Sequence, residues 1–111
     1  MKVRKSEVLF EEARKDLEVG CYNKAVSAAY FSVRLMAEAL IGDIRTTKDD
    51  KIANALGRLL GRDARERMMW LFGERKRADH RVHLFDESTA TQVLEVAREL
   101  LERMKGRIRD L

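Results

Sequence analysis

Apolar residues recur along this chain with the spacing of amphipathic α-helices, and no segment shows the sustained two-residue alternation of a β-strand. A first helix is predicted from about Ser6, as its N-cap, to Val19, where Gly20 ends it. A second helix is predicted from about Asn23 to Ile41. This second helix is apolar on almost every side, which is typical of a helix at the centre of a bundle or in an oligomer interface.

Three more helices are predicted in the second half of the chain. Thr46 and Thr47 are expected to cap a short helix, whose apolar positions follow the i, i+3, i+4, i+7, i+8 pattern: Ile52, Ala55, Leu56, Leu59 and Leu60. A fourth helix begins near Asp63, and a last helix follows a cap at Asp86 or Ser88. Because short connections join these segments, the sequence predicts an all-α fold, an antiparallel up-and-down bundle of four to five helices.

Length and composition narrow the class of protein. A chain of 111 residues suits one domain, here residues 1–111, and 45% hydrophobic residues are enough for a core. The sequence has no apolar run near 18 residues and no secretory signal, so we expect no membrane segment and a cytoplasmic location. The single cysteine cannot form an internal disulfide. No cluster has metal-ligand spacing, so neither a metal nor a cofactor is expected. The all-round apolar second helix predicts a homodimer.

The net charge of +4 is concentrated in residues 58–83, which carry eight basic and four acidic residues. Such an excess of cations in one region indicates a polyanionic partner. The candidate catalytic residues are Arg75 and His80, and the candidate binding residues in or near this region are Arg77, Asp79, Arg81 and His83. An imidazole next to guanidinium groups can transfer protons beside a phosphate.

Helix geometry leaves alternatives for these residues. Positions five apart on an ideal helix point about 140° apart, so Arg75 and His80 converge only across a bend or a dimer cleft. Arg77 and His80, three apart, share a face. A salt bridge from Arg75 to Asp79 is the structural alternative. Another candidate, Arg34, belongs to a polar strip on the second helix, which either forms an internal network or lines the same cleft as His80: Ser27, Tyr30, Arg34 and Glu38.

Segments in both halves of the chain resemble those of a known family. Segments 13–17 (ARKDL), 20–31 (GCYNKAVSAAYF) and 37–40 (AEAL) come first, and 71–79 (LFGERKRAD) follows before the long last helix. In this order they resemble the HEPN domain proteins, over roughly residues 6–108. The resemblance implies a homodimeric helical bundle. It also implies, for active members, a metal-independent ribonuclease with an Arg-x4-6-His motif, often a toxin encoded beside a nucleotidyltransferase antitoxin.

Residue by residue, the motif falls on Arg75 and His80, with Arg77 and His83 as a second fit. The sequence departs from the family at two places. Ribonuclease toxins often have a tyrosine two residues after the histidine, where this chain has Val82. The small prokaryotic members usually have Ala-Asp-Tyr, where this chain has His80 in place of the tyrosine. His80 is therefore either a catalytic residue or a polar replacement for a packing tyrosine.

Three functions remain open from the sequence. The first is a dimeric HEPN ribonuclease toxin. The second is a non-catalytic HEPN module that binds a nucleotide, RNA or a partner nucleotidyltransferase through the same basic region. The third is a helical adaptor that docks a partner through its apolar second helix and binds no nucleic acid.

Overall fold

A computed structural model describes residues 1–42, 48–80 and 82–109, and this part of the chain consists of α-helices and their connections. In chain order the helices are α1 (Lys2–Glu18), α2 (Tyr22–Ile41), α3 (Asp49–Leu60), α4 (Arg62–Ala78) and α5 (Glu87–Arg109). None of them is both long and apolar enough to cross a membrane. The predicted helices all exist. Helix α4 continues through Gly73 as one helix.

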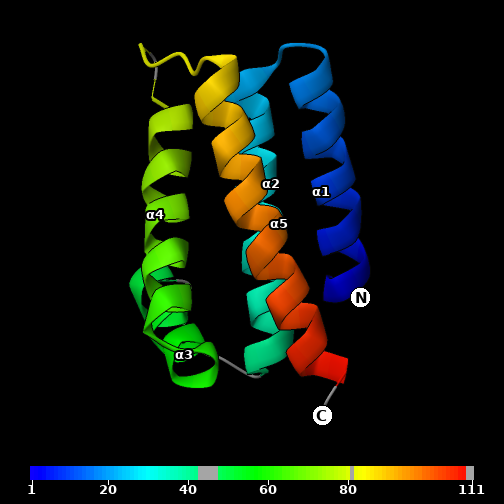
Figure 1. Ribbon diagram of the computed structural model, residues 1–111, viewed down its shortest axis with the longest axis vertical. Coiled ribbons are helices and arrows are strands. Elements are labelled where there is room, and N and C mark those ends of the chain that lie inside the picture. The colour runs from blue at the N-terminus through cyan, green and yellow to red at the C-terminus, as the bar shows by residue number, and fades with distance from the viewer. Residues whose placement is uncertain (43–47, 81, 110–111) are drawn as a thin grey trace.

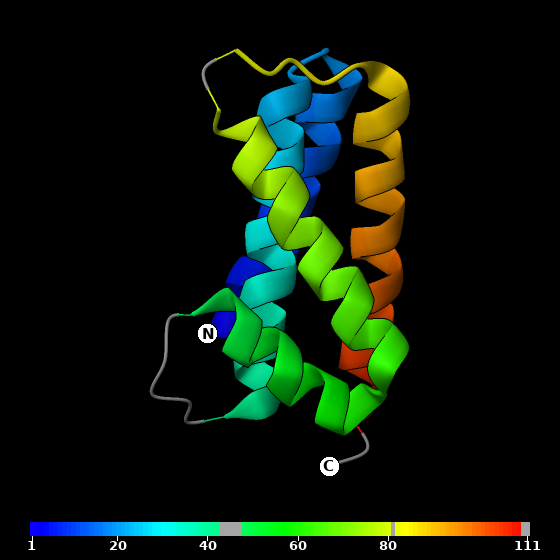
Figure 2. The same ribbon diagram turned by 90° about the vertical axis from the view of Figure 1, so that its left-hand side faces the viewer.

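The four long helices lie side by side and run alternately up and down the bundle (Figure 1). Seen from the side, the short α3 crosses one end of the bundle between α2 and α4 (Figure 2). The opposite end carries both the α1–α2 turn and the connection from α4 to α5. The prediction of an all-α, up-and-down bundle is therefore confirmed.

Helix α2 is the centre of this bundle, because each of the other four helices packs against it. Its buried residues point in several directions around the helix: Ala25, Val26, Ala29, Tyr30, Ser32, Val33, Met36, Ala37 and Leu40. They join one core cluster to which every helix contributes. A helix buried on most sides must be apolar on most sides, which accounts for its composition.

The start of α1 differs from the sequence-based expectation. The helix begins at Lys2, four residues earlier than predicted, and Ser6 is a fully buried residue of its interior rather than an N-cap. Ser6 Oγ donates to the Ser32 carbonyl oxygen at 2.6 Å, and Ser32 Oγ donates to the Ser6 carbonyl oxygen at 2.7 Å. These reciprocal bonds satisfy two buried hydroxyls where α1 meets α2. A serine suited to a cap was instead needed at a helix crossing.

The end of α3 and the start of α5 carry residues suited to helix ends. Gly61 follows α3 with φ +103°, a left-handed conformation that glycine adopts without strain. Asp86 caps α5, because its Oδ1 accepts a hydrogen bond of 2.8 Å from the Thr89 backbone N–H. This bond lowers the pKa of the Asp86 carboxyl below its ordinary value of 3.8. The predicted caps Thr46 and Thr47 lie outside the described residues.

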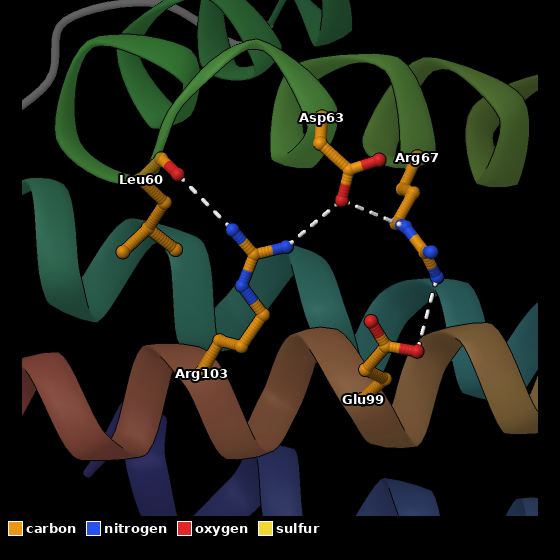
Figure 3. Close-up of polar contacts among 5 residues, drawn as sticks. All are labelled: Leu60, Asp63, Arg67, Glu99 and Arg103. Atoms are coloured by element: carbon orange, nitrogen blue, oxygen red, sulfur yellow. Dashed lines mark hydrogen bonds and ion pairs between the residues drawn. The ribbon is translucent and has the colours of Figure 1, made fainter.

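An arginine-rich clasp joins α4 and α5 near the end that α3 crosses (Figure 3). Arg103 donates to the Leu60 carbonyl oxygen at 3.0 Å and to Asp63 Oδ2 at 3.1 Å. Arg67 also donates to Asp63 Oδ2, at 3.0 Å, and reaches Glu99 Oε2 at 3.1 Å. Because the Leu60 carbonyl ends α3 and has no later helical turn to bond it, the Arg103 contact supplies a partner that the helix itself lacks.

Replacing Arg103 should loosen this end of the bundle. Arg103→Met keeps an apolar stem but removes the donors to Leu60 and Asp63, so we expect the free energy of unfolding to fall by about 1–2 kcal/mol. Arg98→Met is the matched control, because Arg98 makes one exposed ion pair with Glu102, for which a loss under about 0.5 kcal/mol is expected. Urea denaturation measures both. Equal losses in the two variants would contradict the clasp.

The α5 cap should make stability depend on pH. A carboxyl whose pKa is lower in the folded state stabilises the fold above its unfolded-state pKa, and this stabilisation is lost as the pH falls through the folded-state pKa. Asp86→Ala should therefore be less stable than wild type at neutral pH, and the difference should shrink in acid below the ordinary value of 3.8. Thermal unfolding across pH tests this. Ser88→Ala, the alternative predicted cap, should change nothing.

Candidate functional site

The candidate site lies at the end of the bundle that holds the α4–α5 connection (Figure 1). We call residues 79–86 the histidine segment, because it carries both histidines of the chain. It leaves the last turn of α4 and returns to the bundle at Phe85, which is buried in the core. Arg75 and Arg77 therefore lie in the last turn of α4, whereas Asp79, His80 and His83 lie beyond its end.

A shallow hollow of about 520 Å³ opens beside the histidine segment. Its lining combines two imidazoles, two cations and one apolar side chain: Lys76, Arg77, His80, Val82 and His83. We call this the basic hollow. The family motif fits Arg75 with His80 or Arg77 with His83. The hollow brings together one member of the first pair, His80, and both members of the second. Arg75 does not line the basic hollow.

The two imidazoles have different surroundings. His80 is exposed, and its Nδ1 lies 3.5 Å from the Val82 backbone nitrogen. His83 is half-buried, and its ring packs edge-on against Phe85 with 4.6 Å between ring centroids. One imidazole thus faces solvent at the hollow, while the other is held by the core.

The cations of the hollow also have a structural role. Lys76 and Arg77 lie in the last turn of α4, where positive charge stabilises the negative end of the helix dipole. The Lys76 ammonium also lies 5.1 Å from the centroid of the Phe72 ring, and Arg77 lies 3.7 Å from Glu74. Both side chains are nevertheless exposed. The positive charge of these two side chains is thus explained by the helix end. The imidazoles beside them are the reason to expect an anion site.

Arg75 points away from the basic hollow and toward α2. Its Nε lies 3.1 Å from Asp79 Oδ2, and its guanidinium lies 4.9 Å from the Phe31 ring centroid and 5.8 Å from that of Tyr30. The predicted salt bridge with Asp79 is thus confirmed. In this arrangement Arg75 fixes the end of α4 against α2. Its catalytic role stays a prediction.

The polar strip of α2 forms an ion network elsewhere. Arg34 lies 2.9 Å from Asp49 and 3.3 Å from Glu38, which in turn pairs with Lys2 at 3.0 Å. Burial raises the pKa of the Asp49 carboxyl, and the positive charge of Arg75 opposes this rise. Arg34 does not line the basic hollow. For Arg34 and Glu38 the structure supports the predicted internal network, which ties α1, α2 and α3 together. The buried Tyr30 hydroxyl has no hydrogen-bond partner among the described residues, and Ser27 lines another hollow, between α1 and α2.

Several other arginines of residues 58–83 already have polar partners. Arg62 bonds Glu66, Arg65 bonds Asn54, and Arg67 belongs to the clasp described above. The predicted binding residue Arg81 lies outside the described residues. Among the described residues, the cations that line the hollow together with the histidines are Lys76 and Arg77, at the end of α4.

Asn23 is a residue of this site that sequence analysis missed. It lies in the first turn of α2, where it was treated only as the start of a helix. Its Nδ2 donates to the carbonyl oxygens of Ala78, at 3.0 Å, and His83, at 2.8 Å. Its Oδ1 accepts from the Phe85 backbone N–H at 2.9 Å. No sequence pattern signals such bonds, because their partners lie more than 50 positions along the chain.

In the described part of the chain, no group of three or more His, Cys, Asp or Glu side chains could hold a metal ion. A search of curated proteins finds no match to the sequence. Residues 2–107 match the family model of the HEPN domain. This match spans nearly all of the 111 residues and agrees with the helical bundle described above. The chain belongs to the HEPN domain family.

Proposed function

We propose that this HEPN protein is a metal-independent endoribonuclease that acts at the basic hollow. The observation that carries the proposal is the combination of two imidazoles with two exposed cations in one hollow. Metal-free RNA cleavage needs a base, an acid and a positive charge at the phosphate, and this combination contains a candidate for each. Imidazoles suit both proton-transfer roles, because they exchange protons near neutral pH.

The proposed reaction is transesterification. One imidazole removes the proton of the ribose 2′-OH, the 2′-oxygen attacks the adjacent phosphorus, and the bond to the 5′-oxygen breaks. The other imidazole protonates the departing 5′-oxygen, which leaves a 2′,3′-cyclic phosphate and a 5′-hydroxyl. Arg77 and Lys76 stabilise the extra negative charge that develops on the phosphate oxygens. His80 is the better-placed proton carrier, because it is exposed at the hollow, whereas His83 is packed against Phe85.

Two arginines compete for the role that the family motif assigns. The motif pairs Arg75 with His80, while the lining of the hollow favours Arg77. In our proposal Arg77 contacts the phosphate, and Arg75 holds Asp79 and the end of α4 against Phe31. Separate substitutions of the two arginines distinguish these assignments.

The biological setting that we propose is a toxin–antitoxin pair, with a nucleotidyltransferase as the antitoxin. This part rests on the family resemblance. The bundle supports it only in presenting the basic hollow on an open surface, where a partner has access. Growth arrest on expression, relieved by a coexpressed nucleotidyltransferase, is the test; arrest that persists in His80→Ala would contradict it.

A binding module without catalysis is the second candidate. It is favoured by one observation: the motif arginine Arg75 is engaged by Asp79 and stacked near Phe31, and so is not presented to the hollow. Such a module would bind RNA in a salt-dependent manner, because each phosphate contact releases counterions. It would leave the RNA intact at every pH.

We also propose a homodimer, formed through the outer face of α1 and α2. A hollow of about 500 Å³ there has a mostly apolar lining: Lys5, Leu9, Lys24, Ser27, Ala28, Phe31 and Leu35. Phe31 remains 36% exposed within the single chain. Burying this face against a second copy would complete the covering of α2 that the bundle leaves open.

The cleavage assay uses purified protein, mixed RNA and EDTA. Wild type should release products with 2′,3′-cyclic phosphate ends. His80→Ala should reduce the rate by about 100-fold or more, because it removes a proton carrier. Arg77→Ala should reduce it more than Arg75→Ala does, and Arg98→Ala, on α5, should leave it unchanged.

Undiminished cleavage by His80→Ala would reject the proposed mechanism. If wild type does not cleave, RNA binding at several salt concentrations decides between the remaining functions. A binding module predicts that Arg77→Ala lowers the slope of log K against log salt by about 0.7–1 while Arg98→Ala does not. No RNA binding at all would leave the helical adaptor.

The dimer is tested by sedimentation velocity. Wild type should sediment as a dimer, and Ala28→Glu should shift it toward monomer, because burying a carboxylate in a mostly apolar interface costs free energy of desolvation. Gln92→Glu, an exposed change on α5, is the charge-matched control and should remain dimeric. A monomeric wild type, or a dimer unaffected by Ala28→Glu, would place the interface elsewhere or exclude it.

A further inference from the structure

The Asn23 side chain joins the histidine segment to α2 by hydrogen bonds. Three hydrogen bonds radiate from this amide: to the last residue of α4, to His83, and to Phe85 just before α5 begins. Asn23 itself sits in the first turn of α2, the central helix. One amide therefore bridges the start of α2, the end of α4 and the loop that carries the histidines.

The chemistry of the three partners requires an amide. The Ala78 and His83 partners are carbonyl oxygens and need donors, while the Phe85 partner is an N–H and needs an acceptor. A primary amide offers two donor hydrogens and one carbonyl oxygen on a single planar group. Aspartate offers acceptors only, and serine has one donor. Asparagine matches all three partners at this side-chain length.

The remaining contacts of the segment are mainly local. The His80 backbone N–H bonds to Arg77, and the His83 backbone N–H bonds to His80, at 3.0 and 3.3 Å. These turns shape the loop but do not fix its place on the bundle. On either side of His83, Val82 and Leu84 are 82% and 84% exposed, so little packing holds them. The Asn23 bonds and the burial of Phe85 are what place His83 relative to the core.

We propose that Asn23 is a positioning residue, which holds His80 and His83 in place beside Arg77. This inference rests on the proposed function for its catalytic consequence, but the positioning itself can be measured without any activity. Asn23 touches no substrate in this scheme and acts through the backbone of the histidine segment. Without it, the bundle keeps its core while the two imidazoles lose their fixed distance from the cations.

The chain supplies a matched control, because its only other asparagine is Asn54. Asn54 is exposed on α3 and accepts one hydrogen bond from Arg65, at 2.6 Å. Asn54→Ala and Asn54→Asp remove an amide of the same size as that of Asn23. Asn54 is far from the histidine segment in the sequence. These changes should leave the histidines untouched.

The first measurement is NMR of the imidazole C–H groups. The chain has two histidines and therefore gives two sets of signals. In wild type the Phe85 ring, 4.6 Å from that of His83, should shift one set away from the values of a free histidine. Asn23→Ala should move this set toward those values, with unchanged helical circular dichroism. Asn23→Asp, which keeps the shape and the acceptor but loses both donors, should do the same. Neither Asn54 variant should change either set.

The second measurement is the rate of RNA cleavage at a temperature where all variants are folded. Misplacing a catalytic group by about 1 Å can lower a rate by about 100-fold, so Asn23→Ala should lower kcat strongly while KM changes little. Asn54→Ala should keep the wild-type rate. If wild type does not cleave RNA, the proposed function fails, and the NMR measurement alone decides whether Asn23 positions the histidines.

Two results would overturn the inference. One is an unchanged set of histidine signals in both Asn23 variants. The other is a change in those signals that occurs only together with loss of helical structure, which would make Asn23 a general stabiliser of the bundle. For a protein that cleaves RNA, an unchanged kcat in Asn23→Ala would likewise reject a positioning role in catalysis.

Discussion

The structure depends on covering α2. A 20-residue helix with buried side chains on several sides cannot be stable in water, and the bundle surrounds it with the other four helices. This requirement accounts for the tight crossing with α1, where two buried serines bond each other's backbone. It also accounts for the way α4 and α5 are aligned, because both must lie along α2 to cover it (Figure 1). The part of α2 around Phe31 stays partly open, and it is there that we propose the binding of a second copy.

Covering α2 also determines where the functional chemistry can lie. The two ends of the bundle are stabilised in different ways. At one end, Arg103, Arg67 and their acidic partners lock α4 to α5 with side chains that are already paired (Figure 3). At the other end, the cations of the last turn of α4 are exposed beside the histidine segment. Charges that neutralise one another hold the fold, while charges that remain open to solvent can meet a phosphate.

The relation between the histidines and the arginines follows from the end of α4. The helix stops at Ala78, so His80 leaves the helical path and the separation of about 140° expected for Arg75 and His80 no longer applies. His80 instead shares the hollow with Arg77, while Arg75 turns to Asp79 and the rings of α2. The two residues of the Arg75–His80 motif thus lie in different environments. His80 faces solvent, and Arg75 faces the aromatic rings of α2.

The sequence by itself determined the helical class, the approximate bounds of the helices and the family, and it left α2 either at the centre of the bundle or in an oligomer interface. These are properties of local periodicity, capping residues and composition, which act over a few neighbouring positions. It placed the start of α1 too late, because a serine suited to a cap looks the same as one buried at a helix crossing. Only the tertiary structure decided which arginine lies beside His80 and that Asn23 holds the histidine segment. The placement of Arg77 beside His80 depends on where α4 ends. The Asn23 contacts join residues far apart in the chain, and only the packing of the helices around α2 brings those residues together.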